Sequence, residues 1–348
     1  MRKANKESIS IAKHINLYLN EHLPFQGYSQ NTAKSHEYAI SLYLEFLETE
    51  KKIVPERLMG ECFQQSMIEE WLRWLSEKRK CSPETCNVRL GSLRSFLKFF
   101  GGKDVSMLHI SEAASFIDRR KQVRKKICGM SKNAVQALMN APDMNTASGR
   151  RDLTLIVALY GTAARINEML SMKIGQLYLE AKKPYAIIIG KGGKPRTLYL
   201  LPKAVAHLKR YIKESHGDSP RADAYVFYSR NGGPHAMMSQ SAVSKRLKGH
   251  AAKAHKTCPE VPLDIHAHQL RHAKATHWLE EGVNIVQISL LLGHEQLETT
   301  MIYLDITVGQ KANALATLED EKEHSTPKKW KGKESTLSGF CGVKSIKK

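Results

Sequence analysis

The stretch from Asp264 to Asp305 restricts what this chain can fold into and do more than any other part of it. His268 and Arg271 are three residues apart, so both lie on one face of a helix and can reach the same anion. Arginine matches a phosphate with two parallel hydrogen bonds, and histidine can donate another. His294 follows a Leu-Gly pair, and Tyr303 comes nine residues later. The stretch therefore predicts a site that binds a phosphodiester and presents a phenol hydroxyl to attack it.

The charge of the chain favours a polyanionic partner. Its 348 residues contain 54 Lys and Arg against 34 Asp and Glu, a formal net charge of +20. Such an excess is typical of proteins that bind nucleic acid, although a solvated basic surface or contact with acidic lipid would have the same composition. The length is sufficient for two domains, each with its own core.

No segment predicts a membrane span, a signal peptide or a metal site. The longest wholly apolar run, at 155–160, has six residues, against the roughly 20 that span a bilayer. The N-terminus is basic, but no apolar segment follows it. The six cysteines form no CxxC pair, which is typical of reduced thiols in a cytoplasmic protein. The spacing of His255, Cys258, His266 and His268 fits no zinc pattern, so we expect no metal or other cofactor.

The first third of the chain predicts a helical domain over residues 28–118, preceded by a polar N-terminal extension of residues 1–27. Apolar residues recur there at helical spacing. One helix is expected to open with a capping box from Ser66 to Glu69. Another is expected to start with Ser82 as N-cap before a proline and to stop at Gly101.

The rest of the chain predicts a linker, a second domain and a tail. Residues 119–130 are strongly basic and are expected to link the two domains. The second domain is expected at 131–318, ending with a helix over 311–318. Residues 319–348 are rich in Lys, Ser and Gly and predict a flexible tail.

The one clear sheet signal is a hairpin in the second domain. Residues 185–189 and 196–200 are expected to be strands, joined by the turn Gly190-Lys-Gly-Gly-Lys194. This turn is no phosphate-binding P-loop, because neither Gly-Lys pair has the required upstream glycine or a following Ser or Thr.

The ordered set HxxR, LGH and Tyr resembles the catalytic box of the tyrosine recombinases, or phage-integrase family. The resemblance covers about residues 28–318. The segment GTAARINEMLSMK resembles the first arginine motif of that family and places Arg165 in it. Where the usual form has Gly-Leu-Arg, this chain has Ala163-Ala164-Arg165, which leaves the turn less flexible. On spacing alone, an ion pair from Arg165 to Glu168 explains this arginine equally well.

The resemblance implies a mostly α fold with a small β-sheet, arranged as a two-domain, C-shaped DNA clamp. A helical core-binding domain would be followed by an α+β catalytic domain. It also implies a homotetramer on two double-stranded DNA sites, which recombines them through a 3′-phosphotyrosyl intermediate and a Holliday junction, with or without an accessory DNA-bending protein. Integration or excision of a mobile element in a bacterial cytoplasm is the preferred role. Alternatives are an Xer-like resolvase, a type IB topoisomerase and a non-catalytic DNA-binding protein.

The resemblance assigns roles residue by residue. Lys191, rather than Lys194, would protonate the leaving oxygen, and His268 would orient Tyr303 or accept its proton. Glu168 would orient the first arginine, whereas His272 and His277 are expected to be structural. The implied catalytic residues are Arg165, Lys191, His268, Arg271, His294 and Tyr303.

Basic residues on two expected helices are candidates for DNA contact. Arg89, Arg94 and Lys98 lie on the helix that resembles the last main helix of the core-binding domain. Lys245 and Arg246 lie on a helix of the second domain. A solvated basic face is the alternative for both helices.

Overall fold

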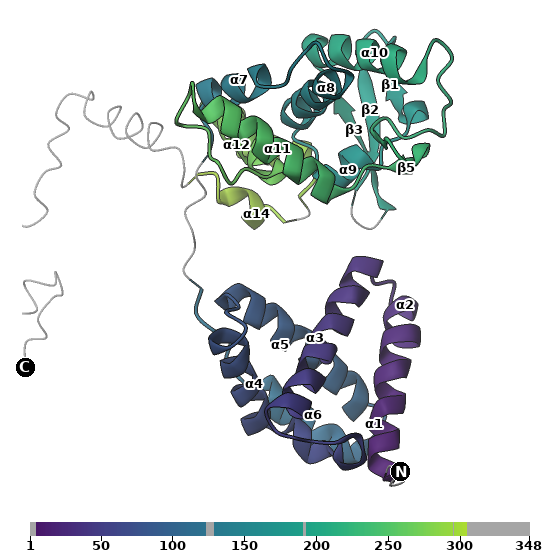
Figure 1. Cartoon of the computed structure of the whole chain (residues 1–348), viewed down its shortest axis with the longest axis vertical. Helices are drawn as coiled ribbons and strands as arrows, with labels where there is room; N and C mark the ends of the chain where they lie inside the picture. Colours follow the sequence, from purple (N-terminus) through teal and green to yellow (C-terminus); the bar gives the residue numbers. More distant parts are fainter. Residues whose placement is uncertain (1–4, 123–128, 191–192, 295, 305–348) are drawn as a thin grey trace, which may run out of the picture. The chain divides into compact units, whose positions relative to one another are not determined.

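The computed structural model describes residues 5–122, 129–190, 193–294 and 296–304, and it is mostly helical with two small antiparallel sheets (Figure 1). The chain divides into two compact units, Met1–Lys125 and Lys126–Lys348. Within the described residues, no helix combines the length and the apolar character needed to cross a bilayer. The expected helix at 311–318 and the tail at 319–348 lie outside the described residues.

The first unit is a helical domain with an aromatic core. Tyr43 packs edge-on against Trp71, with ring centroids 5.1 Å apart, and both side chains are fully buried. Short 3₁₀ helices at Pro55–Arg57, Gly60–Phe63 and Val105–Met107 connect the main helices. These main helices are α1 (Lys6–Leu17), α2 (Leu23–Phe25), α3 (Gln30–Thr49), α4 (Gln65–Glu77), α5 (Pro83–Gly101) and α6 (Leu108–Ser115).

Residues before 28 were expected to form an extension outside the helical domain. In the structure, several of them belong to the core of that domain. Ile11 of α1, Tyr18 of the following π-helix Tyr18–His22, and Leu23 of α2 are buried in the same core as α3 and α5. The Tyr18 hydroxyl donates to Ser95 Oγ on α5 at 2.8 Å. Ile11 and Ile15 precede Tyr18 at helical spacing, but this spacing does not show that the segment packs on α3 and α5.

The helix starts show one correct and one wrong prediction. Helix α5 begins as expected, because the Ser82 hydroxyl accepts a hydrogen bond from the Thr85 backbone N–H at 3.3 Å. The capping box predicted from Ser66 to Glu69 is wrong. The N-cap of α4 is Gln64, two residues earlier, and its side chain makes no capping hydrogen bond, whereas the Glu69 carboxylate accepts from the Gln65 side chain at 2.8 Å.

The second unit surrounds a three-stranded antiparallel sheet of order β1-β2-β3, formed by β1 (Leu177–Tyr178), β2 (Tyr185–Ile189) and β3 (Pro195–Tyr199). Alternate strand residues, Ala186, Ile188 and Leu198, enter the apolar core of the unit. A second hairpin, β4 (Tyr228–Ser229) with β5 (Gly233–Met237), was not predicted. The helices of the unit are α7 (Lys132–Asn140), α8 (Ala147–Thr162), α9 (Ile166–Leu170), α10 (Pro202–His216), α11 (Gln240–His255), α12 (Ala267–Glu280), α13 (Ile285–Leu292) and α14 (Glu298–Met301).

A buried carboxylate ties α11 to α8. Asp152 on α8 accepts hydrogen bonds from Arg246 and, at 2.7 Å, from His250 Nε2. Arg151 lies 3.2 Å from the same carboxylate. Burial alone would raise the pKa of Asp152, but the hydrogen bond from His250 and the charges of both arginines outweigh it and lower this pKa. Arg246, a candidate for DNA contact, therefore has an internal partner.

We expect Asp152→Asn to lower the free energy of unfolding by roughly 3 kcal/mol at pH 7, because it uncouples buried charges. A lowered folded-state pKa stabilises the fold above the unfolded-state value, about 3.9, and this stabilisation is lost as the pH falls through the folded-state pKa. Urea unfolding of both proteins from pH 7 to pH 3 should therefore show a difference that shrinks below about pH 4. A difference that is constant with pH would contradict the assignment.

Candidate active site

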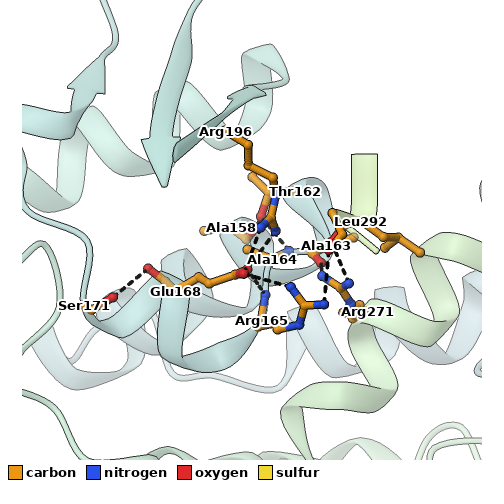
Figure 2. Close-up of polar contacts among 11 residues, drawn as sticks. Ala158, Thr162, Ala163, Ala164, Arg165, Glu168, Ser171, Arg196, Arg271 and Leu292 are labelled. Carbon is orange, nitrogen blue, oxygen red and sulfur yellow. Dashed lines mark hydrogen bonds and ion pairs between the residues drawn. The ribbon is translucent and has the colours of Figure 1, made fainter. Parts of the chain in front are cut away.

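Arg271 joins three segments of the second unit. Its side chain is only 2% exposed. Its guanidinium donates to the carbonyl of Ala163, at the end of α8, and to the carbonyl of Leu292, at the end of α13, both at 2.7 Å (Figure 2). Burial, and then the charge of Arg165, lower the pKa of Arg271 to about 10, so it stays cationic at neutral pH. The fold therefore holds a positive charge at the junction of α8, α12 and α13.

Two left-handed residues make this junction possible. Ala163 has φ 50° and ψ 25° and ends α8, and Gly293 has φ 65° and ends α13. The left-handed region costs a residue with a Cβ about 1 kcal/mol relative to glycine. Ala163 is the position at which the resemblance predicted a less flexible turn. The chain adopts the turn with alanine, and Arg271 bonds the carbonyl that the turn presents.

Glu168 is the centre of a second charged group. It is 6% exposed and lies between two arginines (Figure 2). Arg165 donates to it from its backbone N–H at 2.7 Å and from its guanidinium at 3.0 Å. Arg196 on β3 donates two parallel hydrogen bonds, both 2.8 Å. Burial alone would raise the pKa of Glu168, but these hydrogen bonds and charges lower it.

The ion pair from Arg165 to Glu168, left open as an alternative, is therefore present. The ion pair leaves part of the Arg165 guanidinium accessible to a ligand, because the side chain remains 33% exposed. The second terminal nitrogen of Arg165 lies 3.3 Å from the Gly293 carbonyl. Arg196 was missed by the sequence analysis. The sequence feature that could have drawn attention to Arg196 is its position on the second strand of the hairpin, four residues before the buried Leu200.

Arg196 also packs tightly against the turn that ends α13. A Cβ added to Gly293 would lie 2.9 Å from the central carbon of the Arg196 guanidinium, closer than van der Waals contact allows. The glycine of the LGH triplet thus provides both the left-handed turn and the space for this side chain.

A pocket of about 490 Å³ opens beside these groups. Arg165, Arg196, Lys194 and His294 contribute to its lining. His294 Nδ1 lies 2.8 Å from the Thr300 hydroxyl. Burial, and then the charges of Arg271 and Arg165, lower the pKa of His294 to about 4, so it is a neutral donor at pH 7. Such a cationic pocket suits a phosphate group.

Tyr303 lies against α12 and does not line this pocket. It is 1% exposed, and its hydroxyl lies 2.8 Å from His272 Nδ1. Burial raises the pKa of Tyr303 to about 12, although the charges of Arg271 and Arg165 act against it. Burial, and then the positive surroundings, lower the pKa of His272 to about 4. At neutral pH the phenol therefore keeps its proton and the imidazole of His272 is neutral.

This contact changes two expectations. His268 was expected to orient Tyr303, and His272 was expected to be purely structural. In the structure His272 holds the tyrosine hydroxyl, while the His268 ring lies edge-on to His272 with centroids 5.0 Å apart. His268 is exposed on the face of α12 that also carries His272. The sequence feature that could have indicated a role for His272 is its i,i+4 spacing from His268, which puts both rings on one side of the helix.

Other predicted residues lie as follows. Arg89 stacks over the Tyr38 ring at 4.5 Å, and Arg94 donates to the Ala114 carbonyl at 2.7 Å, so both have partners within their own unit. Lys98 and Lys245 are exposed. DNA contact by these residues and by Arg246 stays a prediction. Lys191 lies outside the described residues.

Within one mostly helical unit, Arg165 and His294 line a cationic pocket, and Arg271 and a buried tyrosine lie close enough for their charges to interact with this group. Such a set is typical of an enzyme of phosphoryl transfer. The phage integrase family model matches residues 129–309, slightly more than half of the chain. The chain belongs to the phage integrase family and is a site-specific DNA recombinase of the tyrosine type.

Relatives and solved structures agree with this assignment. The chain is 28% identical to the tyrosine recombinase XerD of Listeria monocytogenes over 285 residues, 81% of this chain and 90% of the relative. It is 27% identical to the tyrosine recombinase XerA of Pyrococcus horikoshii over 299 residues, 84% of this chain and 90% of the relative. In fold it is similar to the XerH recombinase bound to palindromic difH substrate (TM-score 0.65, 16% identity, 92% of each chain). It is also similar to the Tn1549 transposon integrase in complex with transposon right end DNA (TM-score 0.66, 16% identity, 89% of this chain and 98% of the other).

Proposed function

We propose that this recombinase cleaves and rejoins double-stranded DNA by forming a covalent bond from Tyr303 to a 3′ phosphate. The observation that carries the proposal is that the second unit brings Arg165, Arg271, His294 and Tyr303 close enough together for their charges to act on one another. Arg165 and His294 line a cationic pocket, and the Tyr303 hydroxyl lies against His272. A phosphodiester bound by both arginines would be attacked by the phenol oxygen.

The chemistry requires cations on the non-bridging oxygens, because the attacking oxygen approaches a negatively charged group. Arg165 and Arg271 would bind these oxygens, and His294 would donate a further hydrogen bond. Glu168 and Arg196 would act on the site indirectly, by fixing the guanidinium of Arg165. Each oxyanion donor of this kind contributes roughly 10²–10³ to a rate in comparable enzymes.

The bond changes balance without a cofactor. The phenol gives its proton to a base of the site as a bond forms between the Tyr303 oxygen and phosphorus, the bond from phosphorus to the 5′ oxygen breaks, and a general acid, Lys191 by resemblance, protonates the leaving 5′ oxygen. The phosphotyrosine ester retains the energy of the phosphodiester. A 5′ hydroxyl from a second strand can therefore reverse the step and seal the DNA.

In the cell we propose a tetramer that exchanges strands in two pairs through a Holliday junction. Two roles have support from named relatives. Similarity in fold to a transposon integrase supports integration or excision of a mobile element, and sequence similarity to XerD supports the alternative of an Xer-like resolvase. The element that surrounds the gene would provide the DNA sites for either test.

The first test is covalent trapping. Nicked duplexes that cover candidate sites are mixed with wild-type protein and with Tyr303→Phe, then separated on denaturing gels. We expect a slowly migrating adduct with the wild type and none with the variant, because the variant lacks only the attacking oxygen. An adduct that persists in Tyr303→Phe would refute the nucleophile.

Two further measurements separate the proposal from its alternatives. Recombination between two sites on one plasmid is expected, whereas relaxation of a plasmid without any site would indicate a topoisomerase. DNA retardation in native gels with no adduct on any site of the surrounding element would indicate a binding protein without this chemistry.

A further inference from the structure

The contact between Tyr303 and α12 assigns a role to a residue outside the set that the resemblance implied. Tyr303 is buried, and its hydroxyl lies at hydrogen-bond distance, 2.8 Å, from His272 Nδ1. The His268 ring is adjacent to the ring of His272, not to the hydroxyl in the described contacts. Among the residues that the structure describes, His272 is thus the base that touches the reacting oxygen.

We propose that His272 is a further catalytic residue, which holds the Tyr303 hydroxyl before the reaction and accepts its proton during attack on phosphorus. This inference rests on the proposed function, because it assumes that Tyr303 is the nucleophile. The step balances: the phenol proton moves to His272 Nδ1 as the bond from oxygen to phosphorus forms, and the general acid protonates the leaving 5′ oxygen. In resealing, His272 returns the proton to the phenol.

The electrostatics of the site explain how one histidine can perform both tasks. Without DNA, the charge of Arg271 and the neighbouring His268 and His266 add to burial in lowering the pKa of His272, so the phenol keeps its proton and is unreactive. A phosphodiester bound at Arg165 and Arg271 brings a negative charge that offsets these positive charges. Substrate binding would thereby raise the pKa of His272 and make it a stronger base beside Tyr303.

The chain contains a matched control for this pair. His277, also on α12, lies with its Nδ1 2.8 Å from the hydroxyl of Tyr160, and burial lowers the pKa of this histidine too. The same two kinds of side chain make the same contact there, but the charges that act on His277 are those of Glu280, Lys132 and Lys274, whereas Arg271 acts on His272. A substitution at His277 should therefore reproduce the structural part of a substitution at His272 without its chemical part.

The test uses the full-length protein and a nicked duplex whose scissile 5′ oxygen is replaced by sulfur, alongside the ordinary duplex. A 5′ thiolate leaves without protonation, so the sulfur duplex is insensitive to loss of the general acid but still requires the phenol to lose its proton. Asparagine places an oxygen near the position of Nδ1 and can bond the hydroxyl, but it cannot take up a proton. We expect His272→Asn to slow adduct formation roughly 10²–10⁴-fold on both duplexes, and His277→Asn to react at close to the wild-type rate.

A second variant keeps the test decisive if asparagine disturbs the fold. Free imidazole added to His272→Ala is expected to restore part of the rate, because it can enter the space left by the ring, and it should not affect His277→Ala. Adduct formation by His272→Asn at the wild-type rate, or no response of His272→Ala to imidazole, would overturn the proton-acceptor role while leaving the proposed function intact. Absence of an adduct with the wild-type protein would overturn the proposed function itself, and this inference with it.

Discussion

Replacement of Arg271 by alanine is expected to lower the rate of covalent adduct formation by roughly 10³-fold or more. The loss of a fixed donor at a developing charge costs about 10²–10³ in rate, and here the same side chain also positions its neighbours. Its two hydrogen bonds hold the carbonyls of Ala163 and Leu292. Without them, the turn before Arg165 and the turn before His294 lose their common anchor.

Lysine at the same position provides the control, because it keeps a positive charge but cannot bond two carbonyls and a phosphate in the fixed geometry of a guanidinium. We expect Arg271→Lys to remain strongly defective, by about 10²-fold or more in the same assay. Single-turnover rates on a saturating nicked duplex would measure both variants. Near-normal cleavage by the lysine variant would show that charge alone is sufficient at this position.

The second large effect is expected for Glu168→Ala. Removing this buried carboxylate leaves Arg165 and Arg196 without their shared partner, and breaking a buried ion pair from one side costs about 3–5 kcal/mol of stability. Adduct formation should also fall, because the Arg165 guanidinium is no longer fixed. Urea unfolding and single-turnover cleavage of the same preparation would measure both effects.

Glu168→Gln separates charge from shape. The amide keeps the size of the side chain but not the charge, and it cannot accept all of the hydrogen bonds that the two arginines donate. A double-mutant cycle of Glu168→Gln with Arg196→Met should give a coupling energy of about 1–3 kcal/mol, because the two residues make direct contact. Additive effects would show that the Arg196 contact contributes nothing to the position of Glu168.

Site residues could be predicted from the sequence where they are close together along the chain or occur in a characteristic order. His268 and Arg271 share a helical face by their spacing, and His294 and Tyr303 follow in a fixed order after them. Arg165 was found by its motif, and the structure brings it into one group with Arg271, His294 and Tyr303. These relations require only helical periodicity and the order of a few residue types.

The missed features depend on contacts between distant segments. Arg196 reaches Glu168 only because β3 folds back over α9, and no local pattern on the strand shows this. His272 immediately follows Arg271 and was set aside as structural, because its role depends on how the segment with Tyr303 packs against α12. In the first unit, Tyr18 bonds to Ser95 on α5, a contact between distant segments that local apolar spacing does not show.

The close approach of Arg196 to Gly293 links two positions that are far apart in the sequence. Even a methyl group at 293 would meet the guanidinium before it met the backbone. Each position therefore limits which residues the other can tolerate. A side chain at 293 would require the Arg196 guanidinium to move, which disturbs its two hydrogen bonds to Glu168, and it would also strain the left-handed backbone of that position. We therefore expect the effects of substitutions at the two positions to depend on each other.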